Sequence, residues 1–438
     1  MTTYARRLGL FSGTMTVVGG IIGGGIFRTP ATVAERLSTP AAVLMTWVAG
    51  GVVALIGAFC WGELGQRRPR AGGGYVYLRE TFGPLPAFLY GWTLVLVIAT
   101  GAIAAVAVTF ADYALPLVGL PHRFSVPVAV GSIVLLAGIN YVGVRPAAIT
   151  QNVFTLLKLA AIAALIVAGL VLAVPHLPSV QRSNSPTLGF GAALVPVLFT
   201  YGGWQQTNFI AEEIIEPERN LPRALVIGVF IVVAVYLLTN VAYLRILGHA
   251  RLAASTAPAA EVMESLFGHV GGRVIAAGIA VSTFGFLNLV ILVTPRVLQA
   301  MAADRVFFAR LAVLHPVYRT PTLAIVALAV CAIILTLTGT FGQLVDYVTF
   351  GDWIFFGLTA AALFVYRSRE EGAGSTAAFR VPGYPITPAL FVLAAAFVVF
   401  SAIASNPRNA LIGAGLIALG VPVFVYWRSR PASVRLRP

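Results

Sequence analysis

Long apolar runs alternate with short segments rich in glycine, proline and charge along the whole chain. A helix that crosses the hydrocarbon core of a bilayer needs about 20 apolar residues, and these runs are close to that length or longer. The runs fall at residues 11–35, 41–65, 85–112, 126–144, 148–174, 189–214, 222–247, 270–298, 321–339, 343–366, 387–405 and 409–427. The pattern predicts an all-α integral membrane protein with twelve transmembrane helices.

The composition excludes a soluble globular protein. Hydrophobic residues make up 59% of the 438 residues and charged residues only 10%, against roughly 25% charged in an ordinary soluble domain. No hydrophilic stretch is long enough for a separate soluble domain, and the longest are at about 248–269 and 367–386. We expect residues 259–267 to form a short external helix. The first apolar run is too long for the core of a signal peptide, so we expect it to be retained.

The basic residues predict the orientation of the chain. Of the 29 Lys+Arg residues, 21 lie on one side of the predicted spans, together with the N-terminus and the tail. Cytoplasmic loops carry the excess of Lys and Arg, so both termini are expected in the cytoplasm and the protein in the cell inner (plasma) membrane. The net charge of +14 therefore indicates topology and gives no reason to expect a nucleic-acid partner. The basic tail, residues 428–438, is expected near anionic lipid.

The first and sixth apolar runs contain segments that weaken a helix near the middle of the membrane. Residues 18–27 read VGGIIGGGIF, and Pro196 precedes FTYGGW at 199–204; each glycine costs a helix about 1 kcal/mol relative to alanine. Corresponding interruptions in two halves of a chain indicate a transporter binding site between inverted repeats. Freed amides suit a carboxylate and freed carbonyls suit an ammonium, so an α-amino acid matches the two breaks. Close helix packing at the glycines is the alternative interpretation.

Three segments resemble the L-type amino acid transporter (light-chain) family of the amino acid–polyamine–organocation (APC) superfamily. They are GGGIF at 23–27, YVYLRETFGPLPAFLYGW at 75–92 and FTYGGWQQTNFIAEEIIEPERNLP at 199–222. The resemblance implies a LeuT-like fold with ten helices in two inverted five-helix repeats, broken helices 1 and 6, alternating access and two peripheral C-terminal helices. The domains expected on that basis are a core at 1–385 with repeats at about 11–174 and 189–366, peripheral helices at 386–427 and the tail at 428–438.

The resemblance also implies a substrate site at the two breaks. The amides of Gly24 and Gly25 would hold the substrate carboxylate, and the Phe199 ring would act as an external gate beside Trp204. The carbonyls of Ile21, Phe199 and Gly202 would accept from the α-ammonium. The full set of expected substrate-binding residues is Ile21, Gly23, Gly24, Gly25, Phe199, Thr200, Gly202, Trp204 and Gln205. Gly24 stands where the family frequently has Ser, and residues 205–206 read QQ where it often has Asn followed by an aromatic residue, so side-chain selectivity stays open.

Lys158 is the single lysine of the chain. If its helix begins near Ala147, Lys158 lies about 16 Å along it, near the bilayer centre, where a lysine is suited to a charge or proton switch. If the helix begins near Asn152, the depth is about 9 Å and the side chain snorkels to the interface. In relatives a lysine on the fifth helix occupies the sodium position, so we expect sodium-independent transport. Ser282 and Thr283 are expected beside Lys158 as coupling residues, although such hydroxyls often bond back to their own helix.

Other charged residues lie near the predicted span ends. Glu63 precedes Arg67 by four residues, which allows a local ion pair. Acidic residues within 212–219 form either a gating salt-bridge network or a solvated helix end. Asp346 and Asp352 are expected in the external half of the tenth span, facing water or paired with arginine.

Neither an enzyme nor a channel is expected. The chain has no HExxH zinc motif, its five histidines lie in or beside predicted loops, and no charged ring or filter signature indicates a pore. No cofactor or metal is expected. Both cysteines, Cys60 and Cys331, lie in apolar runs, so no obligate glycoprotein partner is expected of the kind that animal light chains bind through an external cysteine.

The sequence therefore predicts secondary active transport of neutral L-amino acids, by sodium-independent exchange. A proton-coupled amino acid symporter is the alternative mechanism. A cationic amino acid or polyamine transporter is the alternative substrate class, but it favours an acidic residue near residues 199–206, and that segment has none.

Overall fold

The computed structural model describes residues 3–172, 189–339, 341–370 and 378–429, and every regular element in these ranges is a helix. A single parallel β-bridge joins Leu8 to Ile214. The first half contains α1 (Leu10–Ile21), η1 (Gly25–Phe27), α2 (Thr29–Arg36), α3 (Pro40–Arg67), α4 (Gly74–Phe82), α5 (Pro84–Thr93), η2 (Leu94–Ala99), α6 (Thr100–Leu117), η3 (His122–Phe124), α7 (Ser125–Val142) and α8 (Val144–Val171). The second half contains α9 (Gly189–Thr200), η4 (Trp204–Glu213), α10 (Pro217–Ala254), α11 (Pro258–Ala303), η5 (Ala309–Ala312), α12 (Thr322–Thr338), α13 (Phe341–Glu370), α14 (Ile386–Ser405), α15 (Pro407–Ala418) and α16 (Gly420–Ser429).

Eight helical segments of the described chain are long and apolar enough to cross a membrane. They are Pro40–Arg67, Pro84–Leu117, His122–Val142, Val144–Val171, Pro217–Ala254, Pro258–Ala303, Ile386–Ser405 and Pro407–Ser429. The other four predicted spans correspond to α12, to α13 and to two interrupted helices, α1 with α2 and α9 with η4. The protein is thus an all-helical, multi-pass membrane protein, and the total of twelve spans stays a prediction.

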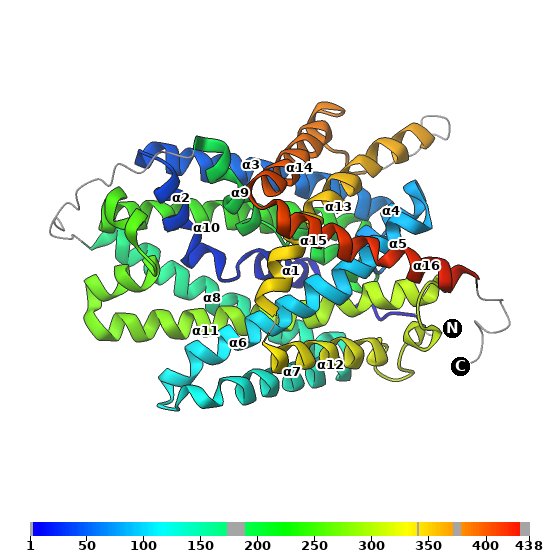
Figure 1. Ribbon diagram of the computed structural model, residues 1–438, viewed down its shortest axis with the longest axis horizontal. Coiled ribbons are helices and arrows are strands. Elements are labelled where there is room, and N and C mark those ends of the chain that lie inside the picture. Colours follow the sequence, from blue (N-terminus) through cyan, green and yellow to red (C-terminus); the bar gives the residue numbers. More distant parts are fainter. Residues whose placement is uncertain (1–2, 173–188, 340, 371–377, 430–438) are drawn as a thin grey trace.

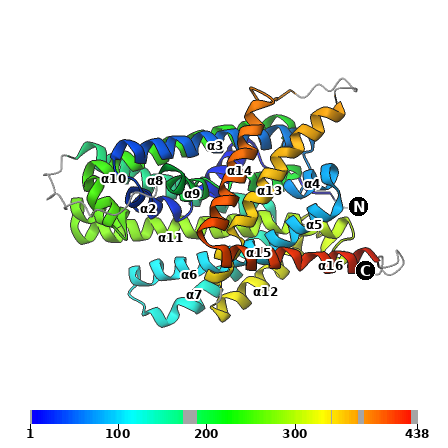
Figure 2. The ribbon, with the colours of Figure 1, turned by 45° about the horizontal axis from the view of Figure 1, so that its top comes forward.

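The long helices α3, α8, α10 and α11 run side by side along the long axis of the molecule (Figure 1). α13 and α14 cross this bundle at an angle, and α15 and α16 follow along its side (Figure 2). The segment before α1 and the end of α16 lie at the same end of the bundle in both views, whereas α2 lies toward the opposite end. The first and last described segments of the chain therefore lie at the same end of the bundle.

The bounds of α8 and α11 test two local predictions, the short helix at 259–267 and the depth of Lys158. Residues 259–267 are helical and are set off from the rest of α11 by a kink at Gly268, where φ is 58°, so the predicted short helix is present. α8 begins at Val144, which places Lys158 about 21 Å along it. The shallow position expected for a start near Asn152 is therefore wrong. The side chain of Asp346 and the tail after Ser429 lie outside the described residues.

Candidate functional site

The first helix is interrupted at its glycine-rich segment, as predicted. α1 ends at Ile21, Ile22 is extended, and the 3-10 turn η1 begins at Gly25. Gly24 and Gly25 therefore lie at the N-terminal end of a helical turn, where backbone N–H groups lack partners within the helix. Such an end suits a carboxylate.

The sixth predicted span is interrupted as well, and the two breaks touch. α9 ends at Thr200, and Gly203 has a φ of 117°, in the left-handed region that favours glycine. A Cβ at Gly203 would collide with the carbonyl group of Gly20. The Tyr236 hydroxyl from α10 is 3.0 Å from the carbonyl oxygen of Ile21 and 3.4 Å from that of Thr200. One side chain thus bridges the ends of both half-helices.

A cavity of about 180 Å³ lies beside the contact between the breaks. Its lining residues come from α1, η2, α6, α9, the turn that follows α9, η4, α11 and α13: Gly20, Leu94, Ile98, Ala99, Ala102, Phe199, Gly202, Gly203, Gln205, Gln206, Phe209, Phe286, Val290, Thr294, Asp352, Trp353 and Phe356. Of the predicted substrate-binding residues, this cavity brings together Phe199, Gly202 and Gln205. It lies between these helices, next to the point where the two breaks meet.

The remaining predicted substrate-binding residues surround the break and are not part of the cavity lining. They are Ile21, Gly23, Gly24, Gly25, Thr200 and Trp204. The Thr200 hydroxyl donates to the Pro196 carbonyl at 2.8 Å and is 2.9 Å from the Thr29 hydroxyl. Trp204 is buried against Phe356 and Phe391, so it supports the aromatic wall from behind.

The Phe199 ring closes one part of the cavity together with Trp353. Their centroids are 6.3 Å apart and their planes lie at 86° to each other, an edge-to-face pair. The carbonyl oxygen of Phe199 accepts a 3.0 Å hydrogen bond from the Gly202 amide. The ring is therefore attached to the turn that forms the second break.

Lys158 is fully buried and points at the first break. Its ammonium donates to the carbonyl oxygens of Ile22, at 2.8 Å, and Gly19, at 3.3 Å. The Ser282 hydroxyl donates to the next carbonyl along, that of Gly23, at 3.3 Å. The Thr283 hydroxyl bonds only to carbonyls of its own helix among the described residues. Lys158 of α8 and Ser282 of α11 thus both donate hydrogen bonds to backbone carbonyls of the break, whereas Thr283 makes no such bond to the described residues there.

Two ion-pair clusters lie near the ends of the helices. Glu213 and Arg296 are both fully buried and form a bidentate pair, with Nε to Oε1 at 2.7 Å and Nη2 to Oε2 at 3.3 Å. A solvated end for this segment is therefore wrong at Glu213. Glu63 pairs with Arg67, as predicted, and also with Arg367 of α13.

The N-terminal segment covers the Glu213–Arg296 pair. The backbone amides of Arg7 and Leu8 donate to the Glu213 carbonyl at 2.9 and 3.0 Å. The Tyr4 ring lies 6.0 Å from the Arg296 guanidinium. Burial raises the pKa of the Tyr4 hydroxyl well above its ordinary value, although the charge of Arg296 opposes the shift.

Some residues of the cavity were not predicted from the sequence as site residues. Asp352 lines it, although we expected Asp352 to face water or pair with arginine, and no ion pair of Asp352 is found among the described residues. Gln206, Trp353, Phe286 and Thr294 also line it. The signal that could have indicated Asp352 is a carboxylate in an apolar span, because ionisable residues at membrane depth usually face a cavity.

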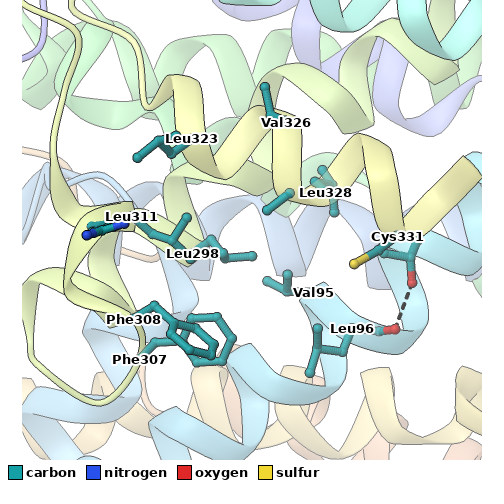
Figure 3. A pocket seen from close by; sticks show the side chains of 13 residues that line it. Val95, Leu96, Leu298, Phe307, Phe308, Leu311, Leu323, Val326, Leu328 and Cys331 are labelled. Carbon is teal, nitrogen blue, oxygen red and sulfur yellow. Dashed lines mark hydrogen bonds between the residues drawn. The ribbon is translucent and has the colours of Figure 1, made fainter.

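A second pocket, of about 480 Å³, has a different character. It lies between η2, α11, η5 and α12, and most of its side chains are apolar, including Phe307, Phe308 and Leu311 (Figure 3). The π-helical segment η2 separates the two spaces, since Leu94 lines the central cavity and Val95 lines this pocket. Besides Arg310, Thr100 and Cys331, every residue that lines the larger pocket has an apolar side chain, and no carboxylate is among them.

No cluster of three or more potential metal ligands occurs in the described ranges. Both cysteines are free thiols, with Cys60 buried and Cys331 partly exposed. The arrangement therefore offers backbone groups, amide and hydroxyl side chains, one carboxylate and aromatic walls. Such groups bind and release a small polar molecule.

Comparison with known proteins gives matches over nearly the whole chain. Residues 8–426 match the family model described as amino acid permease. The serine/threonine exchanger SteT of Bacillus subtilis is 32% identical over 434 residues, which cover 98% of each chain. The large neutral amino acids transporter small subunit 2 of Homo sapiens is 32% identical over 441 residues, covering 97% of this chain and 82% of that protein. The Asc-type amino acid transporter 1 of Mus musculus is 31% identical over 444 residues, covering 98% and 83%.

Proposed function

The chain belongs to the amino acid permease family, and we propose that it carries out secondary active transport of neutral L-amino acids by sodium-independent exchange. It is a membrane transporter and not an enzyme. Exchange is supported by the name of the Bacillus subtilis relative, a serine/threonine exchanger. Neutral substrates are supported by the name of the human relative, a large neutral amino acids transporter.

The observation that carries sodium independence is the position of the Lys158 ammonium. It lies on the carbonyls of Gly19 and Ile22, where freed backbone oxygens at a broken helix would otherwise coordinate a cation. A positive charge that belongs to the protein needs no sodium from solution. Ser282 supports the same break through Gly23.

The substrate would lie across the two breaks. The amides of Gly24 and Gly25 would bind its carboxylate, while carbonyls of Ile21, Phe199 and Gly202 would accept from its α-ammonium. The side chain would then enter the cavity lined by Phe199 and Gln205. Movement of the Phe199 ring would open the site to one side, and alternating access would open it to the other.

The architecture proposed around this site is a LeuT-like core at residues 1–385 with two inverted repeats, followed by two peripheral helices at 386–427. The contact between the two breaks supports it, because corresponding broken helices meet at the substrate site in such repeats. We place the protein in the cell inner (plasma) membrane with both termini in the cytoplasm. The excess of basic residues on the side of the termini supports that orientation.

The chain is proposed to work without a glycoprotein partner and without a cofactor. Cys60 is buried in α3, and Cys331 lies within α12. Neither position suits an external disulfide with a second protein. Transport by the purified chain alone tests this proposal together with the activity.

The test is uptake of radiolabelled L-amino acids into proteoliposomes that contain the purified chain. Vesicles are either empty or preloaded with unlabelled amino acid, in sodium or potassium buffer, at equal pH or with an inward proton gradient. We expect uptake only into preloaded vesicles and equal rates in the two buffers. Uptake into empty vesicles driven by the proton gradient would replace exchange by proton-coupled symport, and a requirement for sodium would remove the role given to Lys158.

A further inference from the structure

The central cavity contains a carboxylate that forms no hydrogen bond and no ion pair with another described residue, although Tyr90 of α5 lies close enough to interact with it electrostatically. Asp352 lies on α13, is partly exposed, and lines the cavity together with Phe199 and Gly202. It is the one residue with a charged side chain among those that line the cavity. No hydrogen bond or ion pair joins it to another described residue, in contrast to Glu63 and Glu213, which are each paired with arginine.

A second acceptor in the same cavity also lacks a partner. Gln206 of η4 lines the cavity, and its side-chain oxygen is buried without a hydrogen bond in the described part of the chain. The neighbouring Gln205 differs, because its side-chain oxygen accepts from the Gly203 amide at 3.0 Å. Two elements distant in sequence, α13 and η4, therefore present oxygen acceptors without a hydrogen bond to the same cavity, as far as the described residues extend.

Such acceptors are costly at membrane depth unless a donor satisfies them. A carboxyl group accepts a hydrogen bond in both its ionised and its protonated form, and an amide oxygen always does. A substrate whose side chain carries a donor would supply what both groups lack. An aliphatic side chain would leave both unpaired and would displace any water from them.

The size of the cavity limits which substrate side chains it can hold. Its volume of about 180 Å³ is below the range of about 300–1,000 Å³ found for pockets that hold drug-sized ligands. Aromatic rings of Phe199, Trp353 and Phe356 form much of its wall, which leaves few polar contacts for a long charged chain. A small hydroxyl or amide side chain fits this combination better than lysine or arginine.

We propose that Asp352, with Gln206, forms a side-chain subsite that selects small neutral amino acids with hydroxyl or amide side chains over aliphatic ones. This inference rests on the proposed function, since the subsite has a role only if amino acids enter the cavity. It makes Asp352 a specificity-determining residue. Backbone recognition remains with the two helix breaks and does not depend on it.

The test compares substrates of nearly equal shape in the same proteoliposomes. Threonine has a hydroxyl where valine has a methyl group. The ratio of threonine uptake to valine uptake therefore measures the contribution of the side-chain hydroxyl as a hydrogen-bond donor. Loss of a hydrogen bond to a charged group typically costs about tenfold or more, so we expect wild-type protein to favour threonine by about that factor. Asp352→Leu should bring the ratio close to one while valine exchange persists, and Asp352→Asn should give an intermediate ratio.

A control variant and a binding measurement complete the test of the subsite. Asp112→Asn, which changes a carboxylate at the end of α6 that pairs with Ser125 and His122, should leave the ratio unchanged. If Asp352→Leu does not fold, stabilisation of detergent-solubilised Asp352→Asn by threonine and by valine replaces the uptake ratio. An unchanged ratio in a folded, active variant would overturn the subsite, and so would a wild-type preference for lysine over threonine. Absence of any amino acid exchange by wild-type protein would instead overturn the proposed function.

Discussion

The Lys158 ammonium lies 2.8 Å from the carbonyl oxygen of Ile22, the first residue after the end of α1. A buried lysine side chain on α8 thus contacts the backbone where the first helix is interrupted. Ser282 of α11 donates a hydrogen bond to the adjacent Gly23 carbonyl. Side chains from α8 and α11 therefore bind two consecutive carbonyl groups of the break. These two side chains stabilise the break, and substitutions of them can test their contribution to transport.

Lys158→Met should abolish most exchange, because it removes the charge while keeping an unbranched apolar side chain. A hydrogen bond to a charged group is worth about 1.5–3 kcal/mol, so the rate should fall roughly tenfold to a hundredfold. Ser282→Ala removes one neutral hydrogen bond, worth about 1 kcal/mol, and should cost about fivefold. Initial exchange rates per folded protein in proteoliposomes give this ranking, and equal losses for the two variants would contradict it.

Phe199→Ala should sharply reduce transport with folding preserved. The Phe199 ring forms the edge-to-face contact with Trp353, and aromatic pairs contribute about 0.5–1.5 kcal/mol beyond the area they bury. Removing the ring would take away one wall of the cavity and, with it, the proposed gate. Exchange rate and the melting temperature in detergent are measured together.

Phe110→Ala provides the matched control for Phe199, because Phe110 pairs with Phe284 and is not part of the cavity lining. Its exchange rate should stay near that of wild-type protein. If Phe199→Ala has unchanged kinetics, Phe199 is not a gate.

The helix breaks could be predicted from the sequence because helix propensity is a local property. Dense glycine at 18–27 and the FTYGGW segment at 199–204 weaken a helix wherever they occur, and the structure has breaks at both. Hydropathy likewise predicted the helical runs, since each span must bury its own backbone polar groups.

The place of Asp352 could not be predicted in the same way. Residues 199–206 contain no acidic residue, and the cavity receives its carboxylate from α13, about 150 residues farther along the chain. Glu213 gives a similar case, because its partner Arg296 lies 83 residues away. Partners that meet only through tertiary packing leave no spacing pattern, although a charged residue in an apolar span already signals that one exists.

Glu213→Gln should destabilise the protein strongly. Both members of the Glu213–Arg296 pair are fully buried, and removing one partner of such a pair typically costs about 3–5 kcal/mol because a buried charge is left unpaired. The melting temperature in detergent should fall clearly, and the double variant with Arg296→Met should recover part of the loss. The partly exposed Arg251–Glu261 pair is the control, and Glu261→Gln should cost less than about 1 kcal/mol.

Two glycines in the breaks should respond in opposite ways to alanine. At Gly203 the left-handed φ of 117° and the nearby Gly20 carbonyl leave no room for a Cβ, so Gly203→Ala should prevent folding or abolish exchange. At Gly24 φ is −82° and no atom lies within 4 Å of an added Cβ, and the substitution keeps the backbone amide. Gly24→Ala should therefore fold normally and retain exchange if the amide alone binds the carboxylate. Folded yield and exchange rate separate the two cases: loss of exchange in well-folded Gly24→Ala would mean that substrate fills the space beside Gly24, and full activity of Gly203→Ala would mean that the two breaks need not touch during transport.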